Sequence, residues 1–212
     1  MATYDLEEQE KLAELKAWWK RYGNLILVTV ALALLTVAAV RGWDAYKRSQ
    51  AAEASAVYGE VVKAAQAKDA KKVADLSALV RDDYPRTVYA PLASFVAAKF
   101  HVEQGDRKAA REALQWAAEH ARDDEMKAIA RLRLAYVLLD DKAYDEAMKQ
   151  LEGEHPPSFA AAYAEARGDL YAVQGKRAEA RTAYQEALAA TPPEERNTRE
   201  LLQFKLDDLG EA

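Results

Sequence analysis

The side chains best suited to acid–base or metal chemistry are three histidines and two short acidic runs. His101, His120 and His155 lie far apart, and none has a second histidine four residues away that would put two metal ligands on one helix face. The acidic runs at residues 123–125 and 140–141 suit a helix N-cap and a turn, and neither accompanies a nucleophile or a glycine-rich phosphate loop. The sequence therefore predicts no catalytic site, no cofactor site and no metal site.

The composition predicts an all-α protein. Half of the 212 residues are hydrophobic, but only 8 are Gly and 6 are Pro, and the good helix formers Ala, Leu, Glu, Lys, Arg and Gln fill the chain. The net charge of −5 argues against a nucleic-acid partner, which needs a basic face. Cysteine is absent, so the chain suits either the cytosol or the bacterial periplasm.

An uncharged run over residues 22–40 predicts one transmembrane helix in contact with the lipid bilayer. Arg21 and Arg41 bound the run, and a helix of this length measures about 28 Å, close to the ~30 Å hydrocarbon core. Aromatic residues flank it as they do at membrane interfaces: Trp18, Trp19 and Tyr22 before, Trp43 and Tyr46 after. A buried core helix fits less well because Trp and Arg or Lys residues flank both ends of the run. A cleaved signal peptide fits less well because a long charged head precedes the run and the run exceeds the usual apolar core of ~7–15 residues.

The span divides the chain into four expected segments. These are an N-terminal segment at residues 1–21, the span at 22–40, a juxtamembrane linker helix at 41–50, and a soluble domain at 51–212. Four basic residues precede the span and three follow it closely. Charge alone therefore favours a cytoplasmic N-terminus by a single residue.

Internal similarity in residues 51–212 predicts tetratricopeptide repeats. Residues 105–117 and 175–187 share Gly, Arg and Ala at fixed offsets, and residues 142–151 match them about halfway between. A period of about 35 residues is typical of such helix pairs. Residues 52–84 form a further expected pair and residues 195–209 a final helix, so we expect an α-solenoid, with an unrelated helical bundle as the alternative.

Small and aromatic residues at repeat spacing predict how these helices pack. Gly168 is expected to lie opposite Ala180, where two helix backbones approach closely, while Gly175 ends a helix in a left-handed cap and Pro192 stops the next. The expected packing residues are Ala98, Ala110, Ala135, Ala147, Gly168, Tyr171, Ala180, Tyr184 and Ala187.

The first helix of each repeat is expected to line a concave groove that binds another protein. Its inward positions are Phe95, Lys99, Val102, Leu132, Tyr136, Leu139, Glu165, Asp169 and Ala172. Phe95 and Tyr136 are the expected aromatic anchors. Asp169 and Glu165 are expected to give charge selectivity, so that Asp169→Ala leaves stability unchanged. Only Lys99 is basic, which argues against a clamp for C-terminal carboxylates.

Several stretches, in this order, resemble the YfgM-type ancillary subunit of the bacterial Sec translocon. They are residues 18–24 (Trp-Trp-Lys-Arg-Tyr-Gly-Asn), the single span, residues 84–90 (Tyr-Pro-Arg-Thr-Val-Tyr-Ala), residues 130–135 (Ala-Arg-Leu-Arg-Leu-Ala) and residues 165–169 (Glu-Ala-Arg-Gly-Asp). The resemblance implies an inner-membrane adaptor with a cytoplasmic N-terminus and a periplasmic repeat domain. It also implies association with SecYEG and with a membrane-anchored periplasmic chaperone of the prolyl-isomerase type, and it carries over no catalytic residue.

A second function stays open beside it: a membrane-anchored repeat scaffold for another envelope complex, such as division or outer-membrane assembly. The proteins that co-purify after gentle detergent extraction distinguish the two.

Overall fold

A computed structural model describes residues 2–210 of the chain, with side chains from residue 7 onward, and this part is helical without strands. The all-α prediction is confirmed. Two compact units divide the chain, Met1–Ser49 and Gln50–Ala212. Residues 1, 211 and 212, which the predicted segments 1–21 and 51–212 include, lie outside the described residues. The helices are α1 (Ala2–Gln66), α2 (Ala70–Asp83), α3 (Tyr89–Glu103), α4 (Arg107–His120), α5 (Asp124–Asp140), α6 (Tyr144–Leu151), η1 (Pro157–Phe159), α7 (Ala160–Val173), α8 (Arg177–Ala190) and α9 (Arg196–Asp208).

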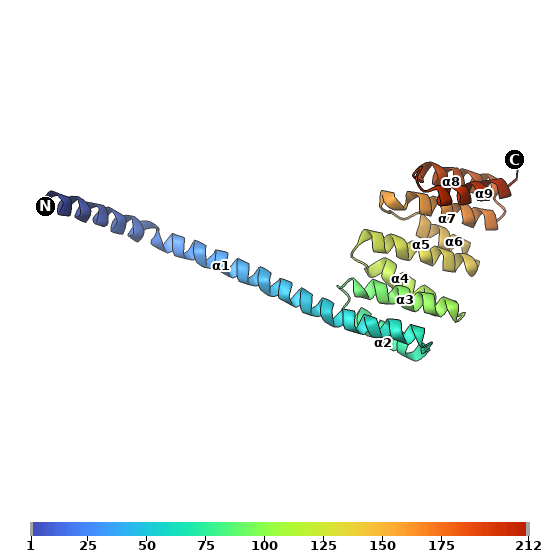
Figure 1. The fold of residues 1–212 in the computed structure, drawn as a ribbon, viewed down its shortest axis with the longest axis horizontal. Helices are drawn as coiled ribbons and strands as arrows, with labels where there is room; N and C mark the ends of the chain where they lie inside the picture. Colours follow the sequence, from blue (N-terminus) through green and yellow to red (C-terminus); the bar gives the residue numbers. More distant parts are fainter. Residues whose placement is uncertain (1, 211–212) are drawn as a thin grey trace. The chain divides into compact units, whose positions relative to one another are not determined.

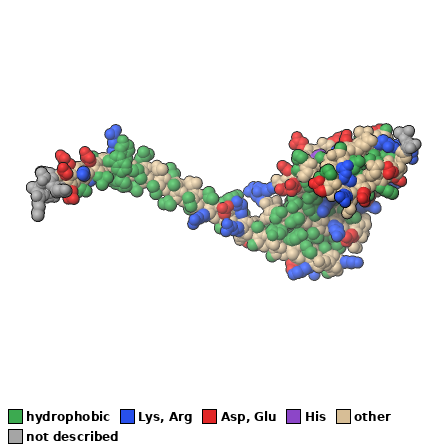
Figure 2. All heavy atoms as spheres, turned by 45° about the horizontal axis from the view of Figure 1, so that its top comes forward, with side chains coloured by type: hydrophobic (Ala, Val, Ile, Leu, Met, Phe, Trp, Pro, Cys, Tyr) green, Lys and Arg blue, Asp and Glu red, His purple; other side chains and the backbone are tan. Residues whose placement is uncertain are grey.

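The first unit is a single stretch of helix with uncovered apolar side chains. Leu34 and Leu35 are 65% and 66% exposed, and Figure 2 shows apolar side chains along this helix with Lys and Arg near both ends of the run. The hydroxyls of Thr29 and Thr36 each donate to the carbonyl four residues earlier, at 2.8 Å. Their polar atoms are therefore satisfied within the helix, as a lipid environment requires. By length and composition, α1 can cross a membrane.

The second unit is a stack of helix pairs (Figure 1). Residues 50–66 of α1 pair with α2, and the later pairs are α3 with α4, α5 with α6, and α7 with α8; α9 packs on α8. The first helices of successive pairs also pack on each other, α3 on α5 and α5 on α7. This arrangement confirms the predicted α-solenoid, with the final helix and the additional first pair both present.

The turn inside each helix pair has the same backbone form. A residue with positive φ follows the first helix every time: Lys68 (φ 57°), Gly105 (79°), Lys142 (58°) and Gly175 (73°). This left-handed conformation costs a non-glycine residue about 1–2 kcal/mol. The predicted left-handed cap at Gly175 is therefore correct, and two other pairs adopt the same turn with lysine in that place.

Aspartates begin three of the helices. The carboxylates of Asp69, Asp106 and Asp123 accept hydrogen bonds from backbone N–H groups at the starts of α2, α4 and α5, at 3.0–3.1 Å. Each bond satisfies a donor that the helix itself leaves free. The first acidic run is thus an N-cap, as its position predicted.

The core consists mainly of small side chains between the helix pairs. Among the expected packing residues, Tyr171 is partly buried, whereas eight are buried: Ala98, Ala110, Ala135, Ala147, Gly168, Ala180, Tyr184 and Ala187. A separate apolar cluster joins α9 to α7 and α8 through Leu202, Leu206 and Leu209. Helix α9 therefore caps the C-terminal end of the stack.

Candidate protein-binding groove

A surface pocket of about 400 Å³ opens between α3 and α5. Four of the nine expected groove residues line it: Phe95, Lys99, Val102 and Tyr136. Val102 and Tyr136 are 43% and 36% exposed, which is uncommon for large apolar side chains in a core. The pocket is thus an apolar surface that a partner's side chain can reach.

The floor of this pocket belongs to the protein core. Phe95 is only 7% exposed and packs within the main apolar cluster, together with the buried Ala98 and Leu114. Truncating a buried Phe costs about 3–5 kcal/mol. The expectation that Phe95 is a binding anchor is therefore revised, because its removal would damage the fold before it tested binding.

Two basic side chains stand at the same pocket. The Arg133 guanidinium lies over the Phe95 ring, 4.9 Å from its centroid, and has no ion pair with any side chain among residues 7–210. Lys99 lies 3.8 Å from Glu103, with its side chain 80% exposed. A single loose ion pair and one unpaired guanidinium leave this surface with a local positive charge.

A second apolar pocket of about 300 Å³ adjoins the first. Lys99 and Glu103 line both pockets, so they form the wall between them. The remaining lining comes from the end of α1 and from α3: Val62, Ala65, Gln66, Val96 and Phe100. We call the two pockets together the α3–α5 groove.

The other expected groove residues are not available as an open lining. Leu132 and Leu139 are half-buried against the main core, and Ala172 packs against the C-terminal cluster. Glu165 and Asp169, the expected source of charge selectivity, both bind Lys205 of α9. The groove thus extends over fewer repeats than the sequence predicted.

Asp169 is the centre of this C-terminal network. Its carboxylate accepts hydrogen bonds from Lys205 at 2.6 Å, from the Tyr184 hydroxyl at 2.8 Å and from the Tyr136 hydroxyl at 3.2 Å. Glu165 accepts a second bond from Lys205, at 2.7 Å. These contacts tie α5, α7, α8 and α9 together, so we now expect Asp169→Ala to lower stability, in place of the unchanged stability expected from the sequence.

The network changes the acidity of its members. Burial, together with the hydrogen bond and negative charge of Asp169, raises the pKa of both the Tyr136 and Tyr184 hydroxyls. Partial burial lowers the pKa of Lys205, but hydrogen bonds to Asp169 and Glu165 outweigh that and raise it overall. All three groups therefore keep their protons more firmly in the folded chain.

Gly168 has a different neighbour from the one expected. A Cβ at this position would overlap the ring of Tyr184, which supplies the three nearest atoms. The small residue on α7 therefore makes room for an aromatic ring on α8. The space beside Gly168 is filled by the Tyr184 ring and not, as expected, by a close approach at Ala180.

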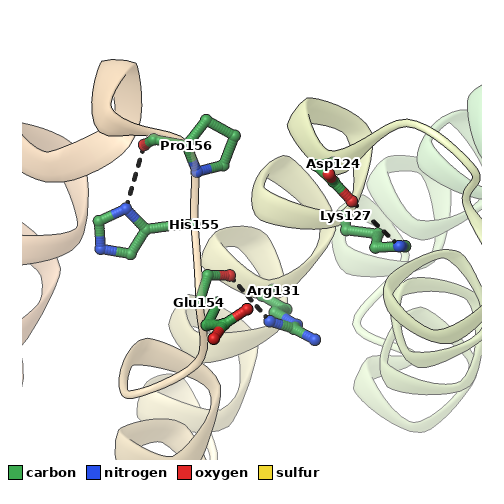
Figure 3. Close-up of a pocket in the computed structure, with 6 residues that line it drawn as sticks. All are labelled: Asp124, Lys127, Arg131, Glu154, His155 and Pro156. Atoms are coloured by element: carbon green, nitrogen blue, oxygen red, sulfur yellow. Dashed lines mark hydrogen bonds and ion pairs between the residues drawn. The ribbon is translucent and has the colours of Figure 1, made fainter.

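A more polar pocket of about 400 Å³ lies at the start of α5, where the chain enters α7 (Figure 3). Lys127 pairs with Asp124 at 3.1 Å, Arg131 donates to the Glu154 carbonyl at 3.1 Å, and His155 contacts the Pro156 carbonyl at 3.1 Å. Within the described residues no buried polar side-chain atom lacks a partner, and no three His, Asp or Glu form a metal-binding group. The Arg131 bond fastens the loop to α5, whereas the other two contacts lie within α5 and within the loop.

Sequence reasoning missed Arg133, Val96 and Val62. The expected groove included only the inward-facing positions of the first helix of each repeat, and these three residues lie beside those positions. Arg133 could have been found as the second of two arginines that alternate with apolar residues from Arg131 to Leu134 in α5. Val62 carries no such signal, because its place depends on how α1 packs on α3.

Comparison with known proteins covers nearly the whole chain. The family described as tetratricopeptide repeat-like domain matches residues 16–211. The ancillary SecYEG translocon subunit of Neisseria gonorrhoeae is 35% identical, over 96% of this chain and 98% of the relative. Proteins of the same name from Haemophilus influenzae and Escherichia coli are 29% and 25% identical, over 87% and 99% of this chain and 90% and 100% of the relatives. No solved structure gives a significant match.

Proposed function

The chain belongs to the tetratricopeptide repeat-like family of ancillary SecYEG translocon subunits, and we therefore propose that it is a membrane-anchored, non-catalytic adaptor at the Sec translocon. In this role it associates with SecYEG and with a membrane-anchored periplasmic chaperone, and assists the folding or transfer of secreted proteins. The names of the relatives support association with the translocon. Association with the chaperone is proposed from the resemblance alone.

The observation that carries the proposal is the long apolar surface of α1, which nothing in the described chain covers. A soluble protein would bury side chains such as Leu34 and Leu35, which here are about two-thirds exposed. A helix with this composition is stable in a bilayer, as expected of an inner-membrane protein. The α3–α5 groove adds a separate apolar surface on which a partner protein can dock.

The proposed segments are a cytoplasmic stretch at residues 1–21, the transmembrane helix at 22–40, a juxtamembrane linker helix at 41–50 and a periplasmic repeat domain at 51–212. Protease added to spheroplasts should digest the repeat domain and spare an N-terminal tag. Loss of the tag under these conditions would reverse the topology.

Gentle detergent extraction tests the adaptor role. A C-terminally tagged chain expressed in its own host should retain SecY, together with an anchored chaperone, through affinity purification. Recovery of division or outer-membrane assembly proteins without SecY would instead favour the scaffold function.

Two variants separate the contributions of the anchor and the groove. The first replaces residues 25–40 with an unrelated apolar span, and the second carries Val102→Ala with Tyr136→Ala. Two anchored proteins meet at high effective concentration in the membrane, so the span can contribute much of the SecYEG association. A groove variant that keeps its melting temperature and still retains every partner at wild-type level would exclude the groove as a partner site.

A further inference from the structure

The α3–α5 groove has a charge pattern that selects one kind of partner. Its two pockets are apolar, and Lys99 and Glu103 stand between them. Beside the first pocket, Arg133 has no acidic partner among residues 7–210; its described contact is with the Phe95 ring. A guanidinium held over an aromatic face keeps its N–H donors free in its own plane.

We propose that this groove binds a short segment of a partner protein that carries two neighbouring large apolar side chains and an Asp or Glu beside them. The apolar side chains enter the two pockets, and the carboxylate pairs with Arg133. This inference rests on the proposed adaptor function, since it specifies what the adaptor's groove recognises.

Charge complementarity favours an acidic segment over a basic one. Glu103 is already paired with Lys99 at 3.8 Å, so the uncompensated charge at the groove is that of Arg133. A basic segment would bring like charge to Arg133, which is unfavourable. A neutral apolar segment would leave the guanidinium partly desolvated without a partner, which also costs free energy.

The inward positions of α7, at the C-terminal end of the repeat stack, show such an ion pair already formed within the chain. There a lysine of α9 enters from outside the repeat and pairs with Glu165 and Asp169 at 2.7 and 2.6 Å. Beside α3 and α5 the sign is reversed: Arg133 lies on the repeat, and no acidic side chain among residues 7–210 pairs with it.

Selection from a random peptide library displayed on phage tests the proposal, with the full chain held in lipid nanodiscs. The expected peptides share two large apolar residues and an adjacent Asp or Glu. Arg133→Glu should weaken their binding by about tenfold or more, and a peptide with Lys in place of its acid should recover binding to that variant. Arg122→Glu, an exposed loop arginine outside both pockets, is the matched control and should bind normally.

A library that yields no binder, or binders that tolerate Arg133→Glu, would overturn the proposal; so would binders without an acidic residue. Melting temperatures of both variants should equal that of the wild type, since Arg133 makes no ion pair in the described chain. The peptide result is independent of the SecY co-purification. Retained SecY with no peptide binding refutes only the groove's specificity, whereas peptide binding without SecY refutes only the translocon role.

Discussion

The inward positions of the first helices differ between the two ends of the repeat stack: those at α3 form an open end, and those at α7 form an end filled by α9. Lys99 on α3 and Asp169 on α7 each follow the small residue of a first helix, Ala98 and Gly168. The side chain of Lys99 is 80% exposed beside an open pocket, whereas that of Asp169 is 19% exposed and bound to Lys205. Lys99 therefore belongs to an open surface, whereas Asp169 stabilises the packing of α7 against its neighbours.

The difference comes from α9. A repeat exposes its concave face unless another element covers it, and α9 covers only the last repeat, through Leu202, Leu206 and Lys205. Each helix pair buries its own small residues in the same way. Whether its inward polar residues are exposed or paired depends on whether another element, such as α9, covers them. Repeat register therefore predicts packing better than it predicts which inward side chains stay exposed.

The largest loss of stability should come from adding a side chain at Gly168, in the end of the stack that α9 fills. Gly168→Leu should destabilise the chain by about 1–3 kcal/mol, because a side chain there meets the Tyr184 ring. Gly59→Leu is the matched control: Gly59 is also helical, but a Cβ added to it would meet no neighbouring atom within 4 Å. Chemical denaturation should show Gly59→Leu as stable as the wild type or more so. Equal stability of both variants would contradict the packing described at Gly168.

Asp169→Ala should cost about 1–3 kcal/mol, because three donors lose an acceptor and Lys205 retains only Glu165. Glu103→Ala, at the open end, should change stability by less than about 0.5 kcal/mol, since its partner is far more exposed. Urea titration of the two variants measures both. If the Glu103 variant proved the less stable, the distinction between the two ends would be wrong.

Alkaline pH should weaken the filled end selectively. The pKa values of Tyr136, Tyr184 and Lys205 are raised in the folded chain above their ordinary values of 10.0, 10.0 and 10.5. Their contribution is therefore fully present below about pH 10 and is lost as the pH rises through the folded pKa values. The free energy of unfolding, followed from about pH 8 to about pH 11, should fall less steeply in Asp169→Ala. Identical slopes would show that the network does not raise these pKa values.

The smallest effect is expected at Arg133. Arg133→Ala should change the free energy of unfolding by no more than about 0.5 kcal/mol, because an exposed side chain without an ion pair contributes little. Thermal melting of the variant checks this. A clear loss of stability would mean that the cation–π contact with Phe95 is structural, and it would weaken the case for a binding role.

The helical class, the apolar run at residues 22–40 and the repeat register were all predictable from the amino-acid sequence alone. These follow from local properties: helix propensity, an uninterrupted apolar stretch, and small residues that recur where two helices must approach. The sequence also located the turn at Gly175 and the cap at Asp123, since each depends on a few adjacent residues.

Which of the inward side chains are exposed and which stabilise the fold depends on tertiary packing. Tyr136 was expected to be exposed and is, yet its hydroxyl also joins a network whose lysine lies on α9, 69 residues farther along the chain. Phe95 has the right repeat position for binding but is buried, because α4 and α5 close over it. Periodicity specifies which way a residue points from its own helix; what it meets there depends on the helices that pack against it.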